Sequence, residues 1–213
     1  MVRVGISVEG QTEERFVKSV LAPYLVKTEI YIMPISMSGD VNIDKVREEL
    51  KKIAFNFDFV TTLYDFYGFS KKESNETKAS LEARILKSVH QSVKDKLIPY
   101  VQMYEFEGLL FSCPESMGRV LQDIEVQKWA SEVLHEFENN PELINDSVET
   151  APSKRLGKFT RYRKTTHGPN IAKEIGIDKI RTMCVGFDEW IQKIESLAGG
   201  ELNIGVMRPQ SHS

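Results

Sequence analysis

Apolar and polar residues follow two alternating patterns along the first hundred positions. Short apolar runs, typical of buried strands, occupy residues 2–8, 29–37, 59–64 and 98–104. Between them, apolar residues recur at helical spacing over residues 12–28, 42–57 and 80–93, with charged residues on the opposite face. The order strand, helix, strand, helix, strand predicts a small parallel sheet with right-handed crossovers.

The second half of the chain has a different pattern, in which helical spacing dominates. Helices are expected over residues 125–139 and most of residues 178–197, with Trp129 and Trp190 on their apolar faces. We therefore predict an α/β fold in two parts. Residues 1–112 would form the α/β core, and residues 113–213 a mostly helical C-terminal extension packed on that core.

Three of the four predicted strands end in an acidic residue. Glu9 follows the first strand, Asp65 the third and Glu105 the fourth, while Glu13 lies one turn into the first helix and Glu107 lies just beyond Glu105. The carboxyl ends of parallel strands share one edge of a sheet, where open α/β sheets bind ligands. If the first, third and fourth strands are neighbours, these carboxylates converge.

Such a cluster of carboxylates repels itself unless cations occupy it. Oxygen-only ligands favour Mg²⁺ or Mn²⁺ over Zn²⁺, and the chemistry of such sites is phosphoryl transfer or phosphodiester cleavage. The ordinary alternative is that acids stand at strand ends because those ends meet solvent. Glu107 has a further ordinary explanation, because an acid near a helix start is favoured by the helix dipole.

A dense group of cations follows in the second half. The group comprises Lys154, Arg155, Lys158, Arg161, Arg163 and Lys164, with Phe159 and Tyr162 interleaved. Cations neutralise phosphates and aromatic rings stack on unpaired bases, so the segment is a candidate nucleic-acid contact. Lys71 and Lys72, just beyond Asp65, could line the same approach. A solvated loop between helices is the alternative explanation of such a charge run.

Composition narrows the remaining choices only slightly. The 213 residues carry a formal net charge of −3, which does not indicate a nucleic-acid binder but leaves room for a local basic patch. Cys113 and Cys184 lack CxxC spacing, so a structural zinc site is not expected. The first strand begins at residue 2, and no apolar run approaches the length of a membrane span. We expect a cytoplasmic protein without a targeting or membrane segment.

Several short motifs resemble, in order and spacing, the DUF4276 family. They are EGQTE at residues 9–13, TLYDFYG at residues 62–68, YVQMYEFEGLLF at residues 100–111, SKRL at residues 153–156 and FDEW at residues 187–190, preceded by Cys184. The resemblance covers nearly the whole chain. The family looks like a member of the Toprim superfamily, the metal-dependent domain of topoisomerases, primases and OLD-type nucleases.

The resemblance implies an acid on the first strand and an Asp-x-Asp pair after the third. Glu9 and Asp65 fit this pattern, but Tyr67 stands at the second position of the pair. Glu13, or Glu105 or Glu107, could supply the missing ligand, or a single metal ion could be held. By analogy with Toprim relatives near phage-defence ATPases, the resemblance also implies a defence role and an ATPase partner protein.

We therefore predict a Mg²⁺- or Mn²⁺-dependent nuclease that acts on DNA or RNA. The metal ligands would be Glu9, Glu13, Asp65 and Glu105, with Glu107 as a helper ligand or base. The nucleic-acid contacts would be Lys71, Lys72, Lys154, Arg155, Arg161, Arg163 and Lys164. The alternatives are a non-catalytic adaptor or sensor subunit of an ATPase-containing defence complex and, ranked last, phosphoryl transfer to a nucleotide. A homodimer is compatible with each of these predictions.

Overall fold

A parallel sheet forms the centre of the protein. The computed structural model describes residues 1–37, 39–144, 150–159 and 162–199. The strands are β1 (Val2–Val8), β2 (Ile30–Ser36), β3 (Phe59–Asp65), β4 (Leu97–Ile98) and β5 (Val101–Gln102). Their order is β2-β1-β3-β4, with β5 also paired to β3, and every pair is parallel. The predicted α/β fold is confirmed, and the first, third and fourth predicted strands are neighbours.

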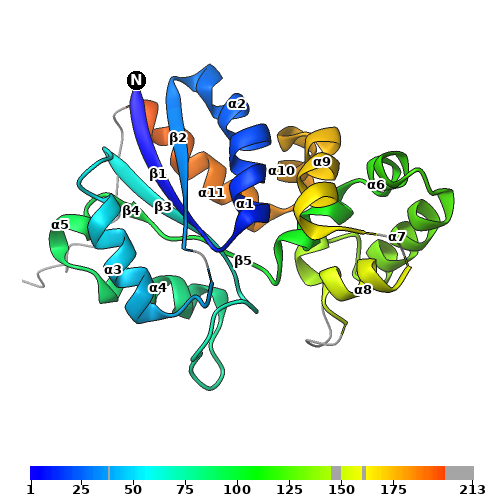
Figure 1. The fold of residues 1–213 in the computed structure, drawn as a ribbon, viewed down its shortest axis with the longest axis horizontal. Helices are drawn as coiled ribbons and strands as arrows, with labels where there is room; N and C mark the ends of the chain where they lie inside the picture. The colour runs from blue at the N-terminus through cyan, green and yellow to red at the C-terminus, as the bar shows by residue number, and fades with distance from the viewer. Residues whose placement is uncertain (38, 145–149, 160–161, 200–213) are drawn as a thin grey trace, which may run out of the picture.

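The helices of the first half cover both faces of this sheet (Figure 1). They are α1 (Gln11–Phe16), the π-helix η1 (Val17–Leu21), α2 (Ala22–Leu25), the 3-10 helix η2 (Val26–Thr28), α3 (Ile43–Ile53), α4 (Lys78–Ser88) and α5 (Gln91–Lys94). The path from α1 to η2 is continuous, as the pattern over residues 12–28 predicted. α3 and α4 lie on the opposite face from α1 and α2.

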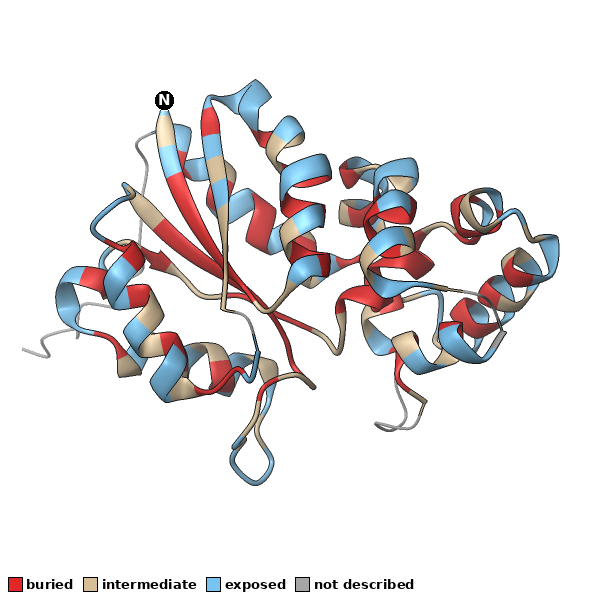
Figure 2. Cartoon of the chain, viewed as in Figure 1, coloured by how far each residue is buried: buried red, intermediate tan, exposed pale blue. Residues whose placement is uncertain are grey.

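The alternation of side chains along the strands explains the two faces. On β1, Val4, Ile6 and Val8 are fully buried against the helical path that starts with α1. On β3, Val60 and Tyr64 point to the other face, into the cluster formed with α3 and α4. The central strands are consequently buried along most of their length (Figure 2), which matches their apolar runs.

Helices make up most of the described chain after residue 105. They are η3 (Phe106–Ser112), α6 (Pro114–Leu121), α7 (Ile124–Glu136), η4 (Pro141–Leu143), α8 (Pro152–Phe159), α9 (Lys164–Ile175), α10 (Ile177–Met183), α11 (Val185–Glu195) and η6 (Ser196–Gly199). Figure 1 shows α6, α7 and α8 beyond one end of the sheet, and α11 behind it. The described ranges contain no helix with the length and apolar character needed to cross a bilayer.

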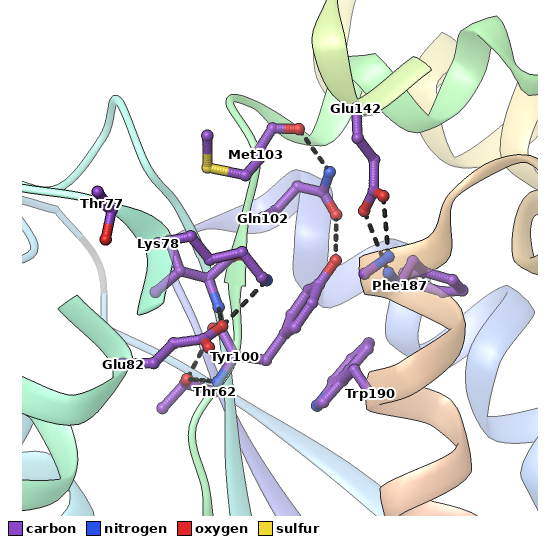
Figure 3. A network of polar contacts seen from close by, with 12 residues as sticks. Thr62, Thr77, Lys78, Glu82, Tyr100, Gln102, Met103, Glu142, Phe187 and Trp190 are labelled. Carbon is purple, nitrogen blue, oxygen red and sulfur yellow. Dashed lines mark hydrogen bonds and ion pairs between the residues drawn. The ribbon is translucent and has the colours of Figure 1, made fainter. Parts of the chain in front are cut away.

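The last long helix, α11, packs beside the sheet through an aromatic stack and is hydrogen-bonded to η4 (Figure 3). Trp190 of α11 stacks on Tyr100, with ring centroids 4.5 Å apart and planes 11° apart. At the start of α11, the Glu142 carboxylate accepts hydrogen bonds from the backbone amides of Gly186 (2.8 Å) and Phe187 (3.1 Å). One hydrophobic cluster contains residues from both sides of residue 112. The predicted boundary between an α/β core, residues 1–112, and a helical extension stays a prediction.

Some predicted elements differ from the observed ones. The helix expected over residues 80–93 is divided into α4 and α5, because Val89 has extended backbone angles. The strand expected over residues 98–104 is reduced to the two-residue strands β4 and β5. The basic segment, for which a loop was the alternative explanation, forms α8 and the start of α9, with Tyr162 and Arg163 outside the two helices.

Candidate functional site

The carboxyl ends of β1 and β3 bring two predicted acids together. Val8 pairs with Leu63 in the parallel ladder, so Glu9 emerges from the sheet beside the end of β3, where Asp65 is the last residue. Asp65 is 3% exposed, and its Oδ1 accepts a hydrogen bond from the Phe106 amide at 2.8 Å. This bond attaches the start of η3 to the end of β3.

Glu13 lies at the same edge because of the turn between β1 and α1. Gly10 is the N-cap of α1, and its amide donates to Glu13 Oε2 at 3.1 Å, as in a capping box. This contact bends the Glu13 side chain back toward the end of β1. Glu13 is 3% exposed and lies close enough to Glu9 for its charge to raise the Glu9 pKa.

Glu107 and Glu105 reach the site from η3 and from the residue before it. Glu107 is fully buried, and its Oε1 accepts a hydrogen bond from the Tyr162 hydroxyl at 3.2 Å. Glu105 is half-buried, and its Oε2 accepts from the Ser153 amide at 2.9 Å, in the first turn of α8. Glu105 therefore connects the acids at the carboxyl edge of the sheet to α8, and this hydrogen bond occupies one oxygen of the Glu105 carboxylate.

Lys164 completes the cluster from the first residue of α9. Its ammonium lies 3.1 Å from Glu107 Oε2 and 3.6 Å from Asp65 Oδ2, and its side chain is 42% exposed. We predicted Lys164 as a nucleic-acid contact, and that role stays a prediction. In this structure its charge faces the acids, a placement that a count of charges along the segment did not indicate.

Packing between α9 and α1 places Lys164 there. Arg15 of α1 donates to the Thr165 carbonyl at 2.9 Å. Gly168 leaves room for the Tyr162 hydroxyl and the Phe106 ring, because a Cβ at that position would lie 2.9 Å from the hydroxyl and 3.2 Å from Cε1 of Phe106. The position of Lys164 thus depends on long-range contacts that no local motif encodes.

The negative charge of the clustered carboxylates exceeds the positive charge that Lys164 supplies. Burial is the largest cause that raises the pKa of Glu9, Asp65 and Glu107, and neighbouring carboxylates add to it in each case. Lys164 lowers all three pKa values but does not cancel the rise. The Lys164 pKa is itself raised, because burial, which lowers it, is outweighed by Asp65, Glu107 and Glu13.

The donor chemistry of the cluster fits a hard divalent cation. Glu9 Oε2 is a buried carboxylate oxygen without a hydrogen bond in the structure, and the buried Glu107 Oε2 faces the Lys164 ammonium at 3.1 Å. Gly68 lies directly against the Glu9 carboxylate, since a Cβ there would be 2.7 Å from Glu9 Cδ. Across the described ranges, however, no three acid, His or Cys side chains are already arranged to hold a metal ion. Metal ligation would therefore require side-chain rearrangement.

The other predicted cations lie around the site rather than in it. Lys154 is exposed on α8, and Arg163 is exposed at the N-cap of α9. The Arg155 guanidinium donates to the Thr150 carbonyl at 2.6 Å and lies 5.5 Å from the centre of the Phe137 ring. Arg161 falls outside the described residues.

The lysine pair after β3 is placed near the acidic edge. Lys71 is exposed in the loop that follows the strand. The Lys72 ammonium donates to the Phe69 carbonyl at 2.6 Å and lies 5.3 Å from the centre of the Phe66 ring. Phe66 directly follows Asp65, so Lys72 is close along the chain to the acids, and its role as a nucleic-acid contact stays a prediction.

Sequence reasoning missed the roles of several aromatic residues. It offered Tyr162 as a ring for stacking on bases, whereas the Tyr162 hydroxyl donates to Glu107. It gave no role to Tyr104, whose ring lies against Tyr67 with centroids 5.3 Å apart. The available signal for Tyr67 and Tyr104 was their place in the sequence, two residues after Asp65 and directly before Glu105.

The fold and site define a parallel α/β protein with buried carboxylates at the carboxyl ends of its strands and one lysine set among them. The chain belongs to the family described as "Domain of unknown function (DUF4276)", whose model matches residues 8–195. No curated protein matches the chain.

Among solved structures, the chain is similar to C-terminal regions of OLD proteins. The C-terminal region of the Burkholderia pseudomallei OLD protein is 14% identical, with 93% of this chain and 99% of that chain covered and a TM-score of 0.48. The C-terminal region of the Xanthomonas campestris pv. campestris OLD protein, phased with iodine, is 16% identical, with 93% and 98% covered and a TM-score of 0.41.

Proposed function

We propose that this chain is a Mg²⁺- or Mn²⁺-dependent nuclease of Toprim type that hydrolyses phosphodiester bonds in DNA or RNA. The observation that carries the proposal is the charge imbalance at the carboxyl edge of the sheet. Three carboxylates there, Glu9, Asp65 and Glu107, have raised pKa values although the Lys164 ammonium lies among the acids. A cation that binds there would relieve this repulsion.

Each side chain of the cluster has a role in this proposal. Glu9 and Asp65, with Glu13 and Glu105, would hold the cation, which supplies Lewis-acid polarisation of the phosphate and a bound water of lowered pKa. Glu107 would accept a proton from the attacking water, because burial raises its pKa toward the range of a general base and Tyr162 orients its carboxylate. Lys164 would neutralise charge on the phosphate.

The polyanion would reach this edge past exposed cations of three chain segments. Lys154 and Arg163 are exposed on the helices beyond the sheet, while Lys71 is exposed after β3. Such cations contact phosphates without regard to sequence, so binding should weaken as salt rises. The ATPase partner and the role in defence against phage come from the family resemblance, and they remain part of this proposal.

The test is a cleavage assay on single-stranded and duplex DNA and RNA, with Mg²⁺, Mn²⁺ or EDTA. We expect cleavage that requires the divalent ion and is lost in Glu9→Gln and Asp65→Asn. Glu14→Gln is the matched control, because Glu14 neighbours Glu13 on α1 but pairs with Lys18 on the helix surface. Full activity of the Glu9→Gln, Asp65→Asn double variant would overturn the proposal.

A non-catalytic adaptor or sensor is the second candidate, and the position of Lys164 favours it. The ammonium already pairs with Asp65 and Glu107, so the fold has an internal cation that could replace a lost metal. Titration calorimetry separates the two functions. An adaptor would show no Mg²⁺ binding that depends on Glu9, whereas a nuclease would.

A further inference from the structure

Two tyrosines meet beside the acidic edge of the sheet. The rings of Tyr67 and Tyr104 have centroids 5.3 Å apart and planes inclined by 33°. Phe66 packs against both, with centroids 6.2 Å from each. Phe66 is buried at 9% exposure, whereas both tyrosines are only partly buried. In this trio the Phe66 ring is buried, and the two tyrosine rings reach solvent.

Backbone contacts hold these rings at the same place as the acids. The Tyr67 amide donates to the Tyr104 carbonyl at 3.1 Å, which extends the pairing of β3 and β5 by one further contact. Tyr67 lies two residues after Asp65, and Tyr104 directly precedes Glu105. Gly68, the next residue after Tyr67, lies against the Glu9 carboxylate. The tyrosine pair thus borders the cluster where a phosphate would react.

A partly exposed aromatic pair beside a phosphate site has a clear chemical use. Every nucleobase presents a π-face, and a protein ring that stacks on it binds without regard to sequence. The Lys72 ammonium over the Phe66 ring adds a positive charge next to the pair. A base inside a duplex is already stacked on both faces, so these rings can take only an unpaired base.

We propose that Tyr67 and Tyr104 form a stacking platform for an unpaired nucleobase, so that the acidic site takes single-stranded DNA or RNA. This rests on the proposed function and adds the form of the substrate to it. The platform also gives Tyr67 a use at the position where the family resemblance leads one to expect a second Asp.

The experiment measures binding without cleavage, by fluorescence polarisation of labelled oligonucleotides in EDTA. The probes are single-stranded DNA and RNA, their duplexes, and an abasic strand that keeps the phosphates but lacks bases. The variants are Tyr67→Leu, Tyr104→Leu and Tyr67→Phe. Tyr31→Leu is the matched control, because Tyr31 is 45% exposed on β2 and lies near the opposite end of the sheet.

We expect each leucine variant to bind single strands roughly tenfold more weakly than wild type, because it loses a ring that stacks on a base. Tyr67→Phe, which keeps the ring, and Tyr31→Leu should bind within about twofold of wild type. The abasic strand should bind all variants alike. Leucine variants that bind single strands as wild type does, or that lose the same factor on the abasic strand, would overturn the platform.

Two further measurements keep the test decisive. If thermal melting shows that a leucine variant is unfolded, Tyr67→Trp replaces it. The tryptophan fluorescence of the Tyr67→Trp protein should be quenched by single strands and not by duplex or abasic strands. Equal quenching by all three would overturn the proposal. Because binding is measured without a divalent ion, a platform without cleavage would refute only the nuclease. Cleavage restricted to duplexes, with intact binding in the leucine variants, would refute only the platform.

Discussion

Removing the Lys164 charge is the perturbation that the site geometry defines most sharply. In Lys164→Met, the stem length is nearly kept while Asp65 and Glu107 lose the ammonium at 3.6 and 3.1 Å. Breaking a fully buried ion pair costs about 3–5 kcal/mol, and the 42% exposure of the Lys164 side chain reduces this through solvent screening. We expect a loss of about 1–3 kcal/mol near pH 8 in metal-free buffer.

The pH dependence of this loss has a definite sign. Carboxyl groups in the unfolded chain titrate at about pH 4, whereas the folded pKa values of Asp65 and Glu107 are raised, chiefly by burial. Between those values the folded state binds more protons than the unfolded state, so stability falls as pH rises. Without Lys164 both folded pKa values rise further, so the variant should lose more stability between about pH 5 and pH 8 than wild type loses.

Urea unfolding at both pH values measures this loss. A change of about 2 kcal/mol would move the midpoint by roughly 1 M at a typical slope for urea. Lys18→Met is the control, because Lys18 forms an exposed ion pair with Glu14 on α1 and should contribute under about 0.5 kcal/mol. A Lys164→Met protein as stable as wild type near pH 8, or a loss equal at both pH values, would refute the electrostatic reasoning.

Three further variants test other parts of the site and its support. Gly68→Ala should weaken Mg²⁺ binding in calorimetry, because its Cβ would displace the Glu9 carboxylate, whereas Gly157→Ala on α8 has open space and should bind as wild type. Asp65→Asn should abolish cleavage yet flatten the fall in stability toward high pH, since it removes a buried charge; an unchanged pH profile would contradict this. Glu142→Ala should lower stability by about 1–2 kcal/mol in urea unfolding, because it removes the acceptor at the start of α11; no loss would show that the contact is weak.

The first half of the fold was predictable because its signals are local. The apolar run at residues 2–8 coincides with β1, and the acids after three of the four predicted strands follow from where the runs stop. The rule that parallel strands end at one edge then predicts Glu9 beside Asp65, and the pairing of Val8 with Leu63 brings the two strand ends together. The two short strands β4 and β5 were less predictable, since each has two residues and is defined by its pairing with β3.

The second half depended on contacts between distant parts of the chain. Counting charges indicated a basic surface, but it could not show that the Lys164 ammonium faces Asp65 and Glu107 or that Tyr162 bonds to Glu107. Those contacts follow from the packing of α9 on α1, to which the hydrogen bond from Arg15 to the Thr165 carbonyl belongs, and from the space that Gly168 leaves for the Tyr162 hydroxyl. The anchoring of α8 by Glu105 was missed for the same reason, because its partner Ser153 lies far along the sequence.

Anomalous diffraction from a crystal soaked in Mn²⁺ tests most directly whether the acid-lined end of the sheet is a divalent-ion site. We predict an anomalous peak within coordination distance of Glu9 and Asp65 in wild type, and none there in Asp65→Asn. A wild-type crystal at saturating Mn²⁺ with no peak beside either carboxylate would contradict the account.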